Sequence, residues 1–298
     1  MDTNLIPAGT IAVGVDGSPS SERALTWAVE QAVADHRALT LVHAVGPVGA
    51  VWMDQAGYDT RIGLRAMQTH SQELLAKAHE EVECKAPGLA VHEMLRVADP
   101  RNLLLEVSRK SAMVVIGSRG RGPVRSLLLG SVGVAVTRHG ECPIVVVRPG
   151  NPGLVRRGVL VGVDGTERSL LPLEFAFRQA SQRQLPLTVL HAFYDVRATV
   201  TSPHLVLERG ADLEEKRLLL AETISGMREK YPDVPVTTEL ALGLADECMV
   251  KMAERMNLVV VGSHHGGAAA EFLFGSVPAT VVEHATCPVA VVPTGGHR

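Results

Sequence analysis

The chain contains few aromatic residues and lacks any long apolar run. Only 3% of its 298 residues are Phe, Trp or Tyr, whereas 46% are hydrophobic, so the core must be built from Val, Leu, Ile and Ala. No apolar stretch reaches about 18 residues, so we expect no membrane span. The net charge is only −3, with acidic and basic residues mixed along the chain, so no nucleic-acid partner is expected.

Cysteine is also scarce, and none of the four cysteines forms a C-x-x-C pair. The N-terminus "MDTNLIPAGT" does not resemble a signal peptide, so we expect reduced thiols and a cytoplasmic location. Cys142 and Cys287 each precede a proline at the start of an apolar run, and this repetition favours a packing role over nucleophilic catalysis.

Motifs for several kinds of enzyme are missing. The P-loop pattern is absent, and G-x-G-x-x-G does not follow the first apolar run, so a dinucleotide fold has little support. We find no trio of nucleophile, base and orienting acid, and therefore name no catalytic residue. His264 and His265 are adjacent, and adjacent loop residues rarely face one metal, so no metal-ligating residue is named either. His43 and His191 are interpreted as buried, hydrogen-bonded histidines rather than general bases.

The sequence contains two copies of one domain-length repeat. "AVGVDGSPSS" at 12–21 returns as "LVGVDGTERS" at 160–169, and "LTLVHA" at 39–44 returns as "LTVLHA" at 187–192. "VVIGS" at 114–118 returns as "VVVGS" at 259–263, and "HGECPIVVV" returns as "HATCPVAVV". This repeat predicts two domains, at residues 1–149 and 158–298, joined by a Gly- and Pro-containing linker at 150–157.

Within each copy, short apolar strands alternate with amphipathic helices. In the first copy we predict strands at 10–15, 39–45, 91–97, 113–117 and 142–147, and a long helix at about 61–86. Ser18 and Asp99 are expected helix caps, each followed by Pro at the first helical position. Val/Ile runs flanked by helices indicate strands buried on both faces. The predicted fold is α/β: two tandem doubly wound domains, each a five-stranded parallel sheet in the order 3-2-1-4-5, with helices on both faces.

The stretch "GSRGRGPVRSLLLGS" at 117–131 combines glycines and arginines directly after a predicted strand. Gly117 and Gly120 could admit a ligand to the backbone or adopt positive φ, and Ser131 is expected to cap the next helix. A helix N-terminus favours phosphate, and the nearby arginines Arg119, Arg121 and Arg125 are suited to phosphate oxygens. Asp16 follows the first strand, where it can accept hydrogen bonds from ribose or a base amine, or help to hold Mg²⁺.

The spacing G-x2-G-x9-G-S occurs at Gly117, Gly120, Gly130 and Ser131. Together with "GVDGS", "LVHA" and "CPIVVV", it resembles the ATP-binding branch of the universal stress protein family, and the tandem arrangement is similar to that of two-domain mycobacterial members. The resemblance implies ATP, usually with Mg²⁺. It also implies, in the first copy, a set of binding residues: Gly14, Asp16, Ala44, Gly117, Arg119, Gly120, Gly130, Ser131 and Val132.

The second copy departs from this pattern at its glycine stretch. Its matching residues are Gly162, Asp164, Ala192, Gly262, Gly275, Ser276 and Val277. His265 stands where the second glycine of the motif belongs, and Glu271 adds a negative charge near the expected phosphates. We therefore expect the second site to be weaker.

These observations favour an ATP-binding universal stress protein that acts as a nucleotide-dependent stress or growth regulator through an unknown protein partner. Two alternatives stay open: a slow ATPase or nucleotide-transfer enzyme, and an interaction module that needs no nucleotide. We expect nucleotide binding without dedicated catalysis. The apolar fifth strands are expected to pair the two copies within one chain, and a homodimer is left open.

Overall fold

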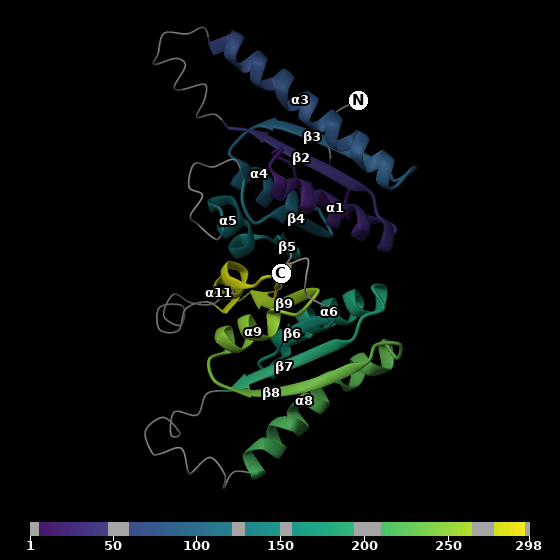
Figure 1. Ribbon diagram of the computed structural model, residues 1–298, viewed down its shortest axis with the longest axis vertical. Coiled ribbons are helices and arrows are strands. Elements are labelled where there is room, and N and C mark those ends of the chain that lie inside the picture. The colour runs from purple at the N-terminus through teal and green to yellow at the C-terminus, as the bar shows by residue number, and fades with distance from the viewer. Residues whose placement is uncertain are drawn as a thin grey trace. The chain divides into compact units, whose positions relative to one another are not determined.

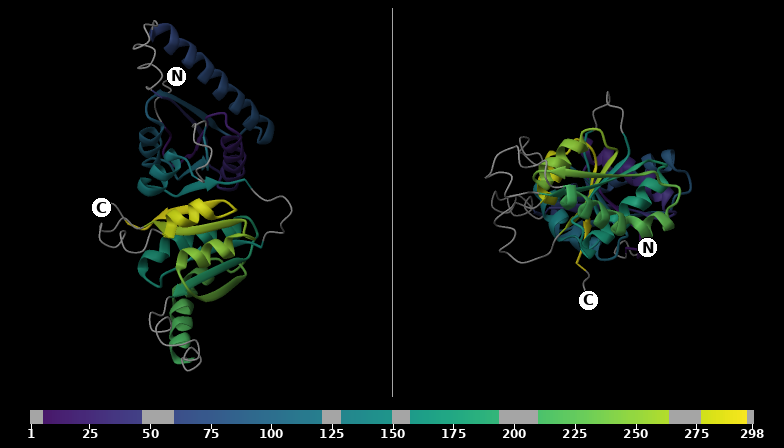
Figure 2. Two further views of the ribbon diagram at one scale, coloured as in Figure 1. Left: turned by 60° about the vertical axis from the view of Figure 1, so that its left-hand side comes forward. Right: turned by 90° about the horizontal axis from the view of Figure 1, so that it is seen from below.

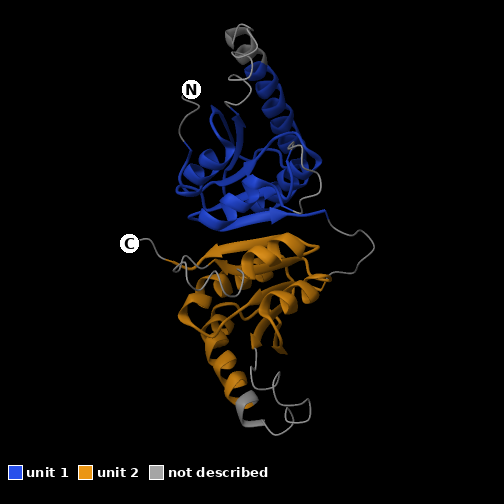
Figure 3. Cartoon of the chain, turned by 90° about the vertical axis from the view of Figure 1, so that its left-hand side faces the viewer, with its two compact units in different colours: residues 1–149 blue, residues 150–298 orange. Residues whose placement is uncertain are grey.

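Figure 1 shows the computed structural model of the chain, which describes residues 6–46, 60–120, 129–149, 157–193, 210–263 and 277–295. The chain divides into two compact units, residues 1–149 and 150–298, coloured blue and orange in Figure 3. Among the described helices, none has the length and apolar composition needed to cross a membrane.

Unit 1 alternates strands and helices along its described residues. The elements are β1 (Ile11–Gly14), α1 (Pro19–Ala34), β2 (Leu39–Val45), α3 (Thr60–Lys85), β3 (Val91–Val97), α4 (Pro100–Ser108), β4 (Met113–Gly117), α5 (Ser131–His139) and β5 (Ile144–Val147). The strands lie in the order β3-β2-β1-β4-β5, and each pairing is parallel. The predicted strand order is therefore confirmed in this unit.

The core of unit 1 lies on both faces of its central strands. Ile11, Ala12 and Val13 of β1 are fully buried, as are Val114 and Val115 of β4. Helices α1 and α3 contact each other and the sheet, and α4 and α5 form a second contacting pair (Figure 2). Continuous burial along β1 and β4 follows from this double cover, because a strand between two helical layers has no face in water.

Unit 2 repeats the same plan. Its elements are β6 (Val159–Gly162), the 3₁₀ turn η1 (Glu167–Ser169), α6 (Leu170–Gln182), β7 (Leu187–Phe193), α8 (Gly210–Lys230), β8 (Val236–Leu242), α9 (Ala245–Ala253), β9 (Leu258–Ser263), α11 (Val277–His284) and β10 (Val289–Pro293). Its described strands are parallel in the order β8-β7-β6-β9-β10. Counted within unit 2 this is again the order 3-2-1-4-5.

Two of the predicted helix caps of unit 1 are confirmed and one is wrong. The side chain of Ser18 accepts a hydrogen bond from Ser21 N at the start of α1, and that of Asp99 accepts one from Arg101 N at the start of α4. Helix α5 is capped by Gly130, without a side-chain bond, and Ser131 is its first helical residue. The backbone therefore enters α5 one residue earlier than predicted.

The two cysteines before the fifth strands are buried. Cys142 is 7% exposed and Cys287 is 1% exposed. Burial raises the pKa of the Cys142 thiol to about 12, because a thiolate would lose its solvation there. Both thiols therefore act as small apolar groups, which agrees with the packing role inferred from their repetition.

Candidate functional site

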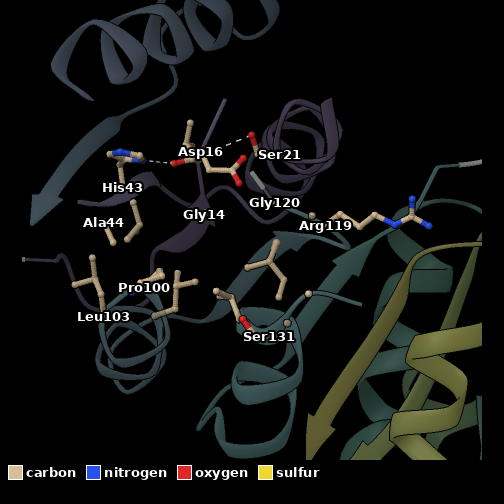
Figure 4. A pocket seen from close by; sticks show the side chains of 18 of the residues that line it. Gly14, Asp16, Ser21, His43, Ala44, Pro100, Leu103, Arg119, Gly120 and Ser131 are labelled. Atoms are coloured by element: carbon tan, nitrogen blue, oxygen red, sulfur yellow. Dashed lines mark hydrogen bonds between the residues drawn. The ribbon is translucent and has the colours of Figure 1, made fainter. Parts of the chain in front are cut away.

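A cavity of about 320 Å³ lies at the carboxyl edge of the unit 1 sheet (Figure 4). Its walls come from the ends of β1, β2 and β4 and from the first turns of α4 and α5. The cavity is lined, among others, by the residues predicted for the first copy: Gly14, Asp16, Ala44, Gly117, Arg119, Gly120, Gly130, Ser131 and Val132. The fold thus gathers residues that lie more than 100 positions apart in the sequence.

The position of the cavity follows from the winding of the sheet. The connection after β1 leads to β2 on one side, and the connection after β4 leads to β5 on the other. The crossovers therefore diverge between β1 and β4, and loops leaving the two strands leave space between them. Asp16 follows β1 and Gly120 follows β4, so the two residues face each other across this space.

One end of the cavity is apolar. Val42 and Ala44 of β2 line it together with Pro100, Leu103 and Leu104 of α4. The start of α4 was predicted from its Asp-Pro cap, but no sequence signal indicated that this helix faces the site. Its apolar residues were missed because a buried leucine has the same pattern whether it packs on a strand or lines a cavity.

Asp16 is held in the turn between β1 and α1. Its Oδ1 accepts a hydrogen bond from Ser18 N at 2.9 Å, and its backbone N donates to Ser21 Oγ at 3.4 Å. In Figure 4 the carboxylate points toward Gly120. The half-buried Asp16 therefore lines the cavity from a turn whose backbone is fixed by these bonds.

His43 ties the end of β2 to the same turn. Its Nδ1 lies 2.6 Å from the carbonyl oxygen of Val15, and because a carbonyl only accepts, Nδ1 carries the proton. His191 repeats this bond to Val163 O in unit 2 at 3.0 Å. The predicted hydrogen bonds are present, but both histidines are half-buried rather than buried, and His43 lines the cavity.

The N-terminus of α5 forms the opposite end of the cavity. The helix begins at Ser131, and the carbonyl of Gly130 accepts the first helical bond from Val134 N at 3.1 Å. The N–H groups of Ser131, Val132 and Gly133 precede the first residue able to bond back into the helix. These donors and the helix dipole create a positive potential suited to an anion.

The glycines of the motif serve different purposes. Among the described glycines, those with positive φ do not include Gly117 or Gly120, so the positive φ that glycine would allow is not used at either position. A Cβ on Gly117 would lie 2.6–2.7 Å from Ser20 C, Cβ and O, whereas one on Gly130 would meet nothing closer than 3.9 Å. Gly117 therefore permits the close packing of β4 against α1, and Gly130 leaves open space beside the helix end.

Arg119 lies at the cavity but directs its charge elsewhere. Arg119 lines the cavity, but its guanidinium points away from the other lining residues in Figure 4. Its carbonyl accepts a hydrogen bond from Ser18 Oγ at 3.4 Å, which joins the glycine stretch to the α1 cap. Arg121 and Arg125 lie outside the described residues.

Unit 2 places part of its predicted set at the equivalent edge. Gly162, Asp164, Ala192 and Gly262 lie at the ends of β6, β7 and β9, and Val277 begins α11. His265, Glu271, Gly275 and Ser276 lie outside the described residues, so the predicted weakness of this site rests there on sequence alone.

The acid of unit 2 has different partners from Asp16. Oδ1 of Asp164 accepts hydrogen bonds from Thr166 N at 2.9 Å, Thr166 Oγ1 at 2.7 Å and Ser169 Oγ at 2.6 Å. In unit 1 the hydroxyl equivalent to that of Ser169 belongs to Ser21 and donates instead to Ser18 O at 3.0 Å. The hydroxyls of the unit 2 turn therefore bond to its own acid, whereas those of unit 1 bond to backbone groups.

The described side chains offer little for metal chemistry without a ligand. Within the described ranges, no group of three or more His, Cys, Asp or Glu side chains is placed to hold a metal ion. Asp16 is the acidic residue that lines the cavity, and one carboxylate beside a phosphate-bearing ligand is an arrangement in which Mg²⁺ keeps several waters. The cavity thus places an anion-binding helix N-terminus, a carboxylate and an apolar wall next to one another.

Comparison with known proteins gives one family over both units. The model of the universal stress protein family matches residues 8–148 and 156–293. A universal stress protein of Mycobacterium tuberculosis H37Rv is 34% identical over 290 residues, covering 94% of this chain and 95% of the relative. A universal stress protein of Mycolicibacterium smegmatis is 33% identical over 287 residues, covering 95% and 96%. A crystal structure of a universal stress protein from Archaeoglobus fulgidus aligns over 97% of each chain with a TM-score of 0.70 at 18% identity, which supports the fold alone.

Proposed function

The chain belongs to the universal stress protein family, and we propose that its unit 1 binds ATP and that nucleotide occupancy regulates a protein partner in the stress response. The observation that carries the proposal is the unit 1 cavity, which joins an apolar end, a carboxylate and a helix N-terminus in one space. Each part suits a different portion of a nucleoside triphosphate.

The cavity suggests how the ligand would be held. A flat apolar base would lie against Val42, Ala44 and the α4 side chains, because these groups offer van der Waals contact without competing charge. Asp16 would accept hydrogen bonds from ribose hydroxyls. The triphosphate would reach the N–H groups at the start of α5, where the helix dipole favours negative charge.

Mg²⁺ would accompany the phosphates in this proposal. Phosphate oxygens and water would supply the ligands of the ion, because the described ranges hold no cluster of acidic side chains there and Asp16 is assigned to the ribose. The ion would neutralise charge between the phosphates.

A regulatory role is favoured over catalysis because the described cavity walls offer positioning groups without a matched base and nucleophile. In the lining histidine, His43, Nδ1 donates to the Val15 carbonyl, and no described serine or cysteine hydrogen-bonds to its Nε2. Occupancy would instead order the groups around α5 and the end of β4, changing the surface presented to a partner. We place this activity in the cytoplasm and leave a homodimer open.

Analysis of small molecules retained by the purified chain tests this function. The protein is denatured after extensive washing, and the released compounds are identified by mass spectrometry. The proposal expects ATP at close to one molecule per chain and negligible turnover in an ATP hydrolysis assay. Turnover abolished by a single cavity substitution would support the enzyme alternative. An empty chain that neither retains nor binds added ATP would favour the nucleotide-independent interaction module.

A further inference from the structure

The second carboxylate oxygen of Asp16 occupies the space where a side chain at position 120 would begin. A Cβ placed on Gly120 would lie 2.6 Å from Asp16 Oδ2 and 3.8 Å from Asp16 Cγ. Contacts of a Cβ below 3.0 Å are essentially never seen, so a methyl group and the observed carboxylate exclude each other. Figure 4 shows the same approach, with the carboxylate directed at Gly120.

Other reasons for glycine at this position are weak. Gly120 is exposed and is not among the described glycines with positive φ, so its backbone can be adopted by other residues. Among the described residues, no atom apart from those of Asp16 comes within 4 Å of the place that a Cβ would take. Turn geometry and close packing therefore do not demand glycine here, in contrast to the tight contact of Gly117 with Ser20.

We propose that Gly120 is a positioning residue whose missing side chain leaves room for the Asp16 carboxylate in the cavity wall, where the carboxylate would accept hydrogen bonds from the ribose. This role rests on the proposed nucleotide binding of unit 1. It differs from the sequence-based expectation, in which Gly120 admits phosphates to the backbone. The glycine acts through the acid, and its effect falls on the nucleoside rather than on the phosphates.

Unit 2 offers an internal comparison for this pair. The residue aligned with Gly120 is His265, so the space that accommodates the unit 1 carboxylate corresponds to a residue with a large side chain. Asp164, the acid aligned with Asp16, directs Oδ1 to three donors of its own turn, from Thr166 and Ser169. Unit 1 therefore combines glycine with an acid whose Oδ2 lies against that glycine, and unit 2 combines histidine in the sequence with an acid whose Oδ1 accepts two hydroxyl bonds from its own turn.

A double-mutant cycle with two ligands tests the role of Gly120. ATP and adenosine are titrated into the full chain and into three variants: Gly120→Ala, Asp16→Ala and the double variant. Each single substitution is expected to weaken adenosine binding by about tenfold, the effect of losing hydrogen bonds from one acceptor. The double variant should bind like Asp16→Ala, because without the carboxylate the methyl group has nothing to displace. Gly46→Ala is the matched control: a Cβ there meets nothing within 4 Å, and Gly46 does not line the cavity.

The outcomes separate this role from its competitors. A Gly120→Ala loss seen with ATP but not with adenosine, or a loss that persists in the Asp16→Ala background, would overturn the proposal in favour of direct phosphate contact. A parent chain that binds neither ligand would instead overturn the proposed function. Because Asp16 Oδ2 is the end of a flexible side chain that can move aside, Gly120→Ala should unfold at the same temperature as the parent chain. If it is less stable, the proposal requires Asp16→Ala to restore that stability.

Discussion

Gly117 shows how a residue of the glycine stretch can act on the fold. A Cβ at this position would lie 2.6 Å from the carbonyl carbon of Ser20, a backbone atom that cannot rotate away. We therefore expect Gly117→Ala to lower the free energy of unfolding by about 1–3 kcal/mol, the usual cost of overpacking. Urea unfolding of Gly117→Ala beside Gly130→Ala checks this, since the nearest atom to a Cβ on Gly130 is 3.9 Å away. Equal stability of the two variants would contradict this packing role.

The cysteines differ in accessibility, and this difference predicts their reactivity. Cys84 is exposed, whereas Cys142 and Cys287 are buried, and burial raises the pKa of Cys142 to about 12. Thiolate is the reactive form, so iodoacetamide at neutral pH should label Cys84 and leave Cys142 and Cys287 unmodified until the chain is unfolded. Peptide mass spectrometry over time measures this order. Labelling of Cys142 as fast as that of Cys84 would show that unit 1 opens near β5.

At this scale the sequence predicted which unit 1 residues would meet, but not the contacts that they would make. The motif spacing brought Asp16 and the three glycines to one cavity, because the ends of adjacent parallel strands share an edge. The reasons for Gly117 and Gly120 depend on Ser20 and Asp16, which lie about 100 positions away in the sequence. The direction of Arg119 depends on its rotamer, and sequence spacing does not encode it.

Among the helices, α4 offers a titratable cap next to the site. Asp99 accepts a hydrogen bond from Arg101 N at 2.8 Å and pairs with the Arg101 guanidinium at 2.6 Å. The hydrogen bond from the Arg101 side chain is the main cause that lowers the pKa of Asp99 from 3.8 to about 2. A lowered folded-state pKa means that the stabilisation is complete above about pH 4 and is lost as the pH falls toward 2.

This cap gives a prediction for two variants. At pH 7, Asp99→Ala should cost about 1 kcal/mol of stability through the lost cap. Asp99→Asn keeps a capping oxygen but loses the ion pair with Arg101. Because that ion pair is exposed, the free energy of unfolding of the parent should exceed that of Asp99→Asn by less than about 1 kcal/mol. Denaturant unfolding between pH 7 and pH 2 should show the difference between parent and Asp99→Asn shrinking only below about pH 4. A stability difference between parent and Asp99→Asn that grows on acidification would contradict the lowered pKa of Asp99.

Element boundaries were predicted best where side chains decide them. The second, third and fourth strands have the predicted limits. The first and fifth strands are shorter than predicted, since pairing stops before the apolar run does: β5 begins at Ile144, after Pro143. The 3₁₀ turn after β6 was not predicted. In the sequence, this turn differs from its unit 1 counterpart in having Glu167 in place of Pro19. Its shape depends on the hydroxyl bonds to Asp164, which the sequence does not show.

Across the whole molecule, duplication made the architecture predictable, because each copy repeats the same order of strands and helices. The strand order within each unit followed from parallel pairing and right-handed crossovers. The weaker second site, predicted from His265 and Glu271, stays a prediction, because both residues lie outside the described part of the chain. The pairing of the two copies through their fifth strands stays a prediction.

Titration calorimetry with ATP on three full-length chains tests the central claim, that unit 1 is the principal nucleotide site. The chains are the parent, Asp16→Ala and Asp164→Ala, which remove equivalent acids from the two units. The parent should bind ATP, and Asp16→Ala should weaken this binding about tenfold, or ~1.4 kcal/mol. Asp164→Ala should change the affinity by less than about twofold, because the proposal places the principal site in unit 1. An unchanged affinity for Asp16→Ala, or a larger loss for Asp164→Ala, would contradict the assignment of ATP to unit 1.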